Sequence, residues 1–173
     1  WQDARTGLAL DETRYDIILS APLHLRQAGS SQLLSQEYLR LVKSRLKAGG
    51  VLAVYSHEGN EAQAKLVQAT LAAAFAHRTT WLEGLITVAS DRPIKMDRDL
   101  LSARMALKDP LYQQMRDLDL KLKEEGGVFA LWDGAEAKLQ MGDKVITDDW
   151  PLLEYPEVAR ALVKAPRLPD RYR

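Results

Sequence analysis

Hydrophobic and polar positions in the first part of the chain predict two strands with a helix between them. Residues 15–20 and 51–56 are largely apolar, β-rich runs, so each is expected to be a strand covered on both faces. Over residues 31–47 or 35–47, apolar positions recur at helical spacing, and the glycines at 49–50 are expected to end that helix. This order predicts a βαβ unit of a parallel sheet, in which ligands bind outside the carboxyl ends of the strands.

A second amphipathic helix and a hairpin are expected next. Residues 61–75 carry an apolar stripe at helical spacing, and residues 78–82 and 85–90 form two short β-rich runs. Only Glu83 and Gly84 separate these two runs, which favours a tight antiparallel turn. The expected fold is therefore α/β, with a mostly parallel sheet that an antiparallel hairpin closes.

The second half of the chain is more charged and mainly helical in pattern. Residues 97–107 and 110–124 are expected to be helices, whereas the apolar run at 128–132 either continues a helix or forms a short strand. We therefore expect two parts, an α/β part over residues 1–95 and a helical extension over residues 96–173.

Composition excludes several classes of function. The 24 basic and 24 acidic side chains cancel, so no positive excess is present to bind nucleic acid. Without cysteine the chain has no disulfides and no thiolate metal sites, which fits a reducing compartment. No apolar run approaches the roughly 20 residues of a membrane helix, and no signal peptide is recognisable. A cytoplasmic location is expected.

Five short motifs carry a resemblance to a known family. They are YDII at 15–18, AGSS at 28–31, LLSQEY at 33–38, LKAGG at 46–50 and TDDWPLLEY at 147–155. Together they resemble the spermidine synthase (polyamine aminopropyltransferase-like) family, over about residues 15–90 and 146–155. The resemblance implies a partial Rossmann-like fold, the second half of a class I methyltransferase-type domain, with a helical C-terminal extension.

The resemblance also implies a reaction. In that family an aminopropyl group passes from decarboxylated S-adenosylmethionine to a polyamine such as putrescine, in polyamine biosynthesis. An acidic residue in the loop after the first strand accepts a proton from the attacking amine. That position falls here at Ser20 and Ala21, and neither side chain is a carboxylate base. The catalytic residue is therefore unknown, and the transferase is expected to be incomplete or degenerate in this chain.

The donor site expected from the resemblance involves Asp3, Ala4 and Ser20. Asp3 and Ala4 resemble the Asp-Gly or Asp-Ala pair that the family places beside the adenine ring. The alternative for Asp3 is a helix N-cap. No GxG motif occurs in the chain, so the glycine-rich half of a nucleoside site is absent from this sequence. The expected co-substrate is decarboxylated S-adenosylmethionine or S-adenosylmethionine, with no covalently bound cofactor.

The acceptor site expected from the resemblance combines a gate loop with a carboxylate cluster. The candidate residues are Pro22, His24, Asp148, Asp149 and Glu154. The three carboxylates would attract a polycationic amine. Their alternative is structural, because the sequence around them has good turn chemistry. For His24 the alternative is a solvent-exposed loop side chain.

Other chemistries are not favoured. His24, His57 and His77 lack the HxxxH or HxH spacing of metal ligands, so no metal site is expected. Three hypotheses remain: a portion of a spermidine synthase-like transferase, a non-catalytic binding or assembly module of the same fold, and an S-adenosylmethionine-dependent methyltransferase.

The expected partners are a nucleoside and a polyamine, not nucleic acid. A homodimer or an N-terminal half is the expected protein partner, and a membrane-fused parent would place this portion in the cytoplasm. Residues 15–20 are expected to be covered by a missing segment, a partner or a rearranged helix, because exposed strand edges recruit partners.

Overall fold

The computed structural model describes residues 3–21, 25, 29–56, 61–82, 84–107, 109–123, 126–135, 144–149 and 153. Its elements in chain order are α1 (Ala4–Leu10), β1 (Tyr15–Ser20), η1 (Ser31–Leu33), α2 (Gln36–Arg45), β2 (Leu46–Tyr55), α3 (Glu61–Ala74), β3 (His77–Trp81), β4 (Ile86–Ser90), α4 (Arg98–Met105), α5 (Pro110–Lys121), η3 (Val128–Leu131) and β5 (Trp132–Ala135). The expected order of strands and helices is confirmed over the first ninety residues.

The strands form one mixed sheet in the order β1-β2-β4-β3-β5. Strands β1 and β2 pair in parallel, and the three remaining neighbour pairs are antiparallel. The α/β class and the antiparallel pairing of β3 with β4 are confirmed. The prediction of a mostly parallel sheet is wrong, because β4 lies between β2 and β3 and β5 adds a further antiparallel pair. The apolar run at 128–132, left open between helix and strand, forms η3 and leads into β5.

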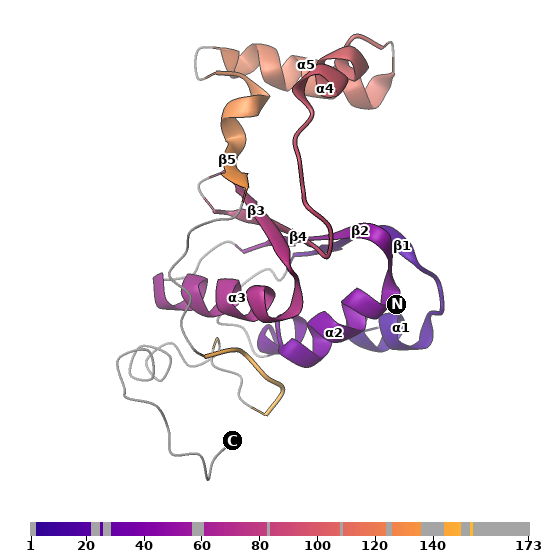
Figure 1. Cartoon of the computed structure of the whole chain (residues 1–173), viewed down its shortest axis with the longest axis vertical. Helices are drawn as coiled ribbons and strands as arrows, with labels where there is room; N and C mark the ends of the chain where they lie inside the picture. The colour runs from indigo at the N-terminus through magenta and orange to yellow at the C-terminus, as the bar shows by residue number, and fades with distance from the viewer. Residues whose placement is uncertain are drawn as a thin grey trace.

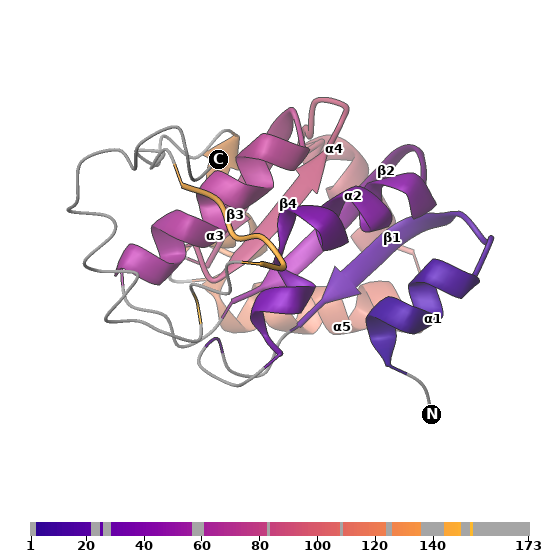
Figure 2. The same ribbon diagram turned by 90° about the horizontal axis from the view of Figure 1, so that it is seen from below.

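Helices cover the sheet unequally. Helices α1, α2 and α3 lie on one side of it, and α4 and α5 lie on the other side (Figures 1 and 2). The core lies under α2 and α3, and the fully buried residues include Leu34, Leu39, Leu52, Leu71, Phe75, Ile146 and Leu153. The last two come from beyond residue 95, so the C-terminal part contributes to the core of the α/β part. The division at residue 95 stays a prediction.

Strand β1 lies at an edge of the sheet and is open on one face. Ile18 packs against the core and Ser20 is buried, but Ile17 and Leu19 point to the opposite face and are 65% and 69% exposed. The prediction that this strand is covered on both faces is therefore wrong for the described part of the chain. No rearranged helix covers β1 there. Cover by a partner or a further segment stays a prediction.

Strand β2 begins earlier than the sequence pattern predicts. Helix α2 ends at Arg45, so the glycines at 49–50 do not terminate it and instead lie within β2. Tyr15 is opposite Leu46 and Ile17 is opposite Val51, so two steps along β1 match five along β2. Residues 47–50 therefore form a large, irregular bulge.

Glycine is required at the bulge for two separate reasons. Gly49 has a φ of +83°, which favours glycine over any other residue. A Cβ atom at Gly50 would lie 2.9 Å from the carbonyl oxygen of Tyr15. The bulge thus depends on the Gly-Gly pair that the sequence pattern predicts to be a helix end.

Helices α4 and α5 begin at residues that favour helix starts. Asp97 and Asp109 cap them by accepting hydrogen bonds from Leu100 N and Leu111 N, each at 2.8 Å, and Pro110 occupies the first turn of α5. Both helices were expected from the sequence. None of the helices in the described ranges combines the length and apolar character that a membrane crossing requires.

Candidate functional site

The candidate site lies at the carboxyl end of β1, the end where ligands bind in sheets of this class. Ser20 ends the strand with only 5% of its surface exposed. Burial raises the pKa of the neighbouring Tyr38 hydroxyl, and a hydrogen bond with Ser20 acts in the opposite direction. Tyr38 is fixed by the start of α2, where its backbone N–H donates to Ser35 Oγ at 3.2 Å. Ser20 therefore lies beside the helix that follows the strand.

An ion pair joins the two ends of the described chain at this place. The guanidinium of Arg5 in α1 donates two hydrogen bonds to the carboxylate of Asp148, at 2.7 and 2.5 Å. The two side chains are 29% and 34% exposed. This pairing raises the pKa of Arg5 and lowers that of Asp148. Because the geometry is bidentate, the negative charge of Asp148 is compensated within the protein.

Backbone contacts hold the segment around Asp148 on two helices. The N–H of Gln36 donates to the carbonyl of Ile146 at 2.8 Å, and the N–H of Ile146 donates to Thr70 Oγ1 at 2.9 Å. The N–H of Asp148 itself donates to Glu37 Oε2 at 3.0 Å. Further along, Gln63 Nε2 donates to the carbonyl of Leu153 at 2.9 Å. These contacts favour the structural alternative for the turn at Thr147–Asp149, here called the TDD turn. In that alternative the segment holds α2 and α3 together.

The remaining predicted site residues divide into two groups. Asp3 is the N-cap of α1, accepting from Thr6 N at 2.8 Å, and this hydrogen bond lowers its pKa. Ala4 begins the helix, and Ala21 and Asp149 are exposed. The N-cap alternative for Asp3 therefore describes its contact in the structure, while its role beside a nucleoside stays a prediction. Pro22, His24, His57 and Glu154 lie outside the described residues.

Sequence reasoning missed three residues at this end, namely Arg5, Glu37 and Tyr38. Glu37 and Tyr38 belong to a quoted motif, and their place in the first turn of α2 was a usable signal. Arg5 had no such signal, because its partner is 143 positions away. No cluster of three or more potential metal ligands occurs in the described ranges.

The structure and the sequence were compared with those of known proteins. The structure is similar to the crystal structure of a probable spermidine synthase from Corynebacterium glutamicum ATCC 13032, with a TM-score of 0.46 and 20% sequence identity. The similarity covers 81% of this chain and 55% of that chain, so the chain spans about half the length of that protein. No family model and no curated protein matches the sequence.

Proposed function

We propose that this chain is a spermidine synthase-like portion that binds a thioether or sulfonium nucleoside and does not by itself transfer an aminopropyl group. The contact between Arg5 and Asp148 carries this proposal. It brings the start of α1, where the expected adenine-contacting pair lies, together with the TDD turn near the end of β1. The expected adenine-contacting pair and the turn at Thr147–Asp149, which are far apart in sequence, thereby lie at the end of the sheet where such folds bind ligands.

The charges at this end support binding without transfer. Aminopropyl transfer needs a base for the proton of the attacking amine, and the family position for it holds Ser20 and Ala21. The carboxylate of Asp148 is engaged by Arg5, and the carboxylate of Asp3 accepts from Thr6 N. Within the described part of this end, Asp148 is thus balanced by Arg5, whereas Asp3 and Glu37 accept backbone hydrogen bonds and Asp149 is exposed. A polyamine would meet an Asp148 carboxylate that is already paired.

The binding part of the proposal is tested by titrating methylthioadenosine and S-adenosylmethionine into the whole chain in a calorimeter. Ala4→Arg places a long side chain where the adenine is expected, and Ala9→Arg makes the same change at an exposed position near the other end of α1. We expect binding of methylthioadenosine that weakens at least about tenfold in Ala4→Arg and less than about twofold in Ala9→Arg. Circular dichroism of each variant checks that it is folded.

The catalytic part is tested separately with labelled decarboxylated S-adenosylmethionine and putrescine. We expect no labelled spermidine, because the base is missing from its family position. Formation of spermidine would contradict the non-catalytic assignment. Absence of heat with both nucleosides in a folded chain would contradict the nucleoside site. Equal weakening of binding in Ala4→Arg and Ala9→Arg would contradict it as well.

A further inference from the structure

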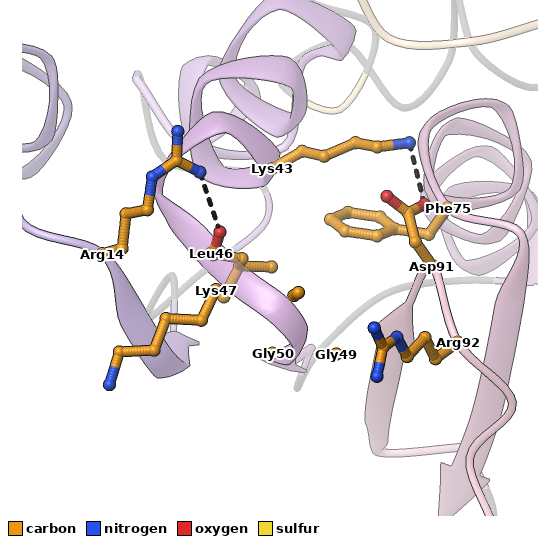
Figure 3. Close-up of a pocket in the computed structure, with 10 residues that line it drawn as sticks. Arg14, Lys43, Leu46, Lys47, Gly49, Gly50, Phe75, Asp91 and Arg92 are labelled. Atoms are coloured by element: carbon orange, nitrogen blue, oxygen red, sulfur yellow. Dashed lines mark hydrogen bonds and ion pairs between the residues drawn. The ribbon is translucent and has the colours of Figure 1, made fainter.

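A basic pocket lies at the other end of the parallel strand pair, away from the candidate site. It has a volume of about 400 Å³ and lies between the end of α2, the bulge of β2 and the turn after β4 (Figure 3). Its charged lining consists of Arg14, Lys43, Lys47, Arg92 and Asp91. Four cations and one anion therefore line the pocket, although the basic and acidic side chains of the whole chain balance.

The two lysines of this pocket already have carboxylate partners. Lys43 Nζ lies 2.8 Å from Asp91 Oδ1 and also 5.8 Å from the centroid of the Phe75 ring. Lys47 Nζ lies 2.7 Å from Asp16 Oδ2, and its side chain points away from the others. The positive charge of the lysines is thus largely balanced by neighbouring acids.

The two arginines differ from the lysines. Arg14 donates to the backbone carbonyl of Leu46 at 3.3 Å, which leaves its charge uncompensated. The guanidinium of Arg92 has no hydrogen-bond or ion-pair partner in the part of the chain that the structure describes, and it lies beside Gly49 (Figure 3). A Cβ atom at Gly49 would approach Arg92 Cδ to 3.2 Å, so the glycine lets the arginine lie close to the bulge.

The lining indicates which chemical class fits. Guanidinium groups bind planar or tetrahedral oxyanions through paired N–H groups, and phosphate is a frequent partner. Phe75 and Leu46 also line the pocket, with 2% and 6% of their surfaces exposed, and add a small apolar area. The pocket volume of about 400 Å³ exceeds what a single phosphate fills. The ligand chemistry is therefore an oxyanion attached to an apolar body.

We propose that this pocket binds a small organic phosphate, with the phosphate held by Arg92 at the bulge and the apolar part lying near Phe75. This site is separate from the nucleoside site and does not depend on it. Binding is expected to weaken as ionic strength rises, because all four cationic side chains are exposed.

The test uses phenyl phosphate as the probe and inorganic phosphate as the comparison, each titrated into the ¹⁵N-labelled chain. We expect phenyl phosphate to shift the amide signals of Gly49 and Gly50 and to bind more tightly than inorganic phosphate. Arg92→Gln should weaken the affinity at least about tenfold. Arg40→Gln removes the same charge from an exposed part of α2 outside the pocket and should change it less than about twofold.

Three outcomes would overturn the proposal. They are equal losses in Arg92→Gln and Arg40→Gln, the absence of saturable binding to a folded chain, and inorganic phosphate binding as tightly as phenyl phosphate. The last result would exclude the organic part of the ligand. None of these outcomes affects the methylthioadenosine titration, so the two sites are judged independently.

Discussion

The two ends of the parallel strand pair use charged side chains differently. At the carboxyl end of β1, Arg5 and Asp148 neutralise each other, and Glu37 accepts a hydrogen bond from the backbone of the same turn. At the starting end, Arg14 and Arg92 face a pocket without a carboxylate partner in the described ranges. Charges at the first end fasten a distant segment to the fold, whereas charges at the second end remain available to a ligand.

This difference shows that a sequence motif at one end of the sheet does not by itself mean that its charged groups are available to a ligand. At the carboxyl end of β1, where the turn at Thr147–Asp149 lies, Asp148 and Glu37 make contacts that dock residues 146–149 on the fold. The starting end, where the LKAGG motif lies, has two arginines whose positive charge no acid balances in the described ranges. A motif therefore indicates where a binding site is expected. Whether its charged side chains are paired within the protein indicates whether that site can bind a charged ligand.

The largest expected effect concerns the docking of the C-terminal segment. Ile146 is fully buried, and its backbone bridges α2 and α3. Ile146→Ala should lower the free energy of unfolding by about 2–5 kcal/mol, because it removes buried methyl groups and leaves a cavity. Urea unfolding followed by tryptophan fluorescence measures this loss. Val145→Ala, at the half-buried neighbour, should cost clearly less, and equal losses would show that the segment is not clamped at Ile146.

A smaller effect is expected from the ion pair itself. Asp148→Asn should lower the free energy of unfolding near neutral pH by about 0.2–1 kcal/mol, since both partners are partly exposed and solvent screens them. Asp149→Asn, in the same turn and exposed, serves as the control. A larger loss of stability in Asp149→Asn than in Asp148→Asn would mean that Asp149, and not Asp148, docks the segment.

The pH dependence of this pair has a definite sign. The folded pKa of Asp148 lies below its ordinary value of 3.8, so its stabilising contribution is complete above that value. The contribution is lost as the pH falls through the lowered folded pKa. The difference between the original chain and Asp148→Asn should therefore shrink once the pH drops below about 4. A difference that stays constant down to acid unfolding would contradict the ion pair as its source.

The smallest effect tests whether Arg14 is free to bind a ligand. Hydrogen bonds with Thr13 and Tyr15 lower the pKa of the nearby Asp11 to about 2. Thr13→Val should raise that pKa toward 3.8 in a carbon-detected NMR titration, while Arg14→Gln should leave it unchanged. A rise in Arg14→Gln would mean that Arg14 is committed to Asp11.

The sequence predicts the elements better than their surroundings. The bounds of β1 and the hairpin of β3 and β4 follow from local patterns, because periodicity and turn chemistry act within a few residues. The open face of β1 does not follow, since an apolar run is the same whether one face or both are covered. The bulge was missed because Gly49-Gly50 after a helical pattern resembles a helix end.

The candidate site shows the same limit more strongly. The turn chemistry of the TDD segment was readable, and the structural alternative named for it agrees with its contacts. The pairing of Arg5 with Asp148 joins residues 143 positions apart, and no local pattern specifies such a partner. The basic pocket was likewise not predicted from the sequence, because only the fold brings Arg14 and Arg92 to one end of the sheet.

The open position of β1 at the rim of the sheet has a consequence for solvent exchange. In a strand with only one neighbour, alternate backbone N–H groups point toward that neighbour and the others point outward. Deuterium should therefore enter β1 in a two-residue rhythm, fast at every second amide, while β4 and residues 52–55 of β2, which have neighbours on both sides, are protected. Slow uptake at all six positions of β1 would reveal that something occupies this rim in solution.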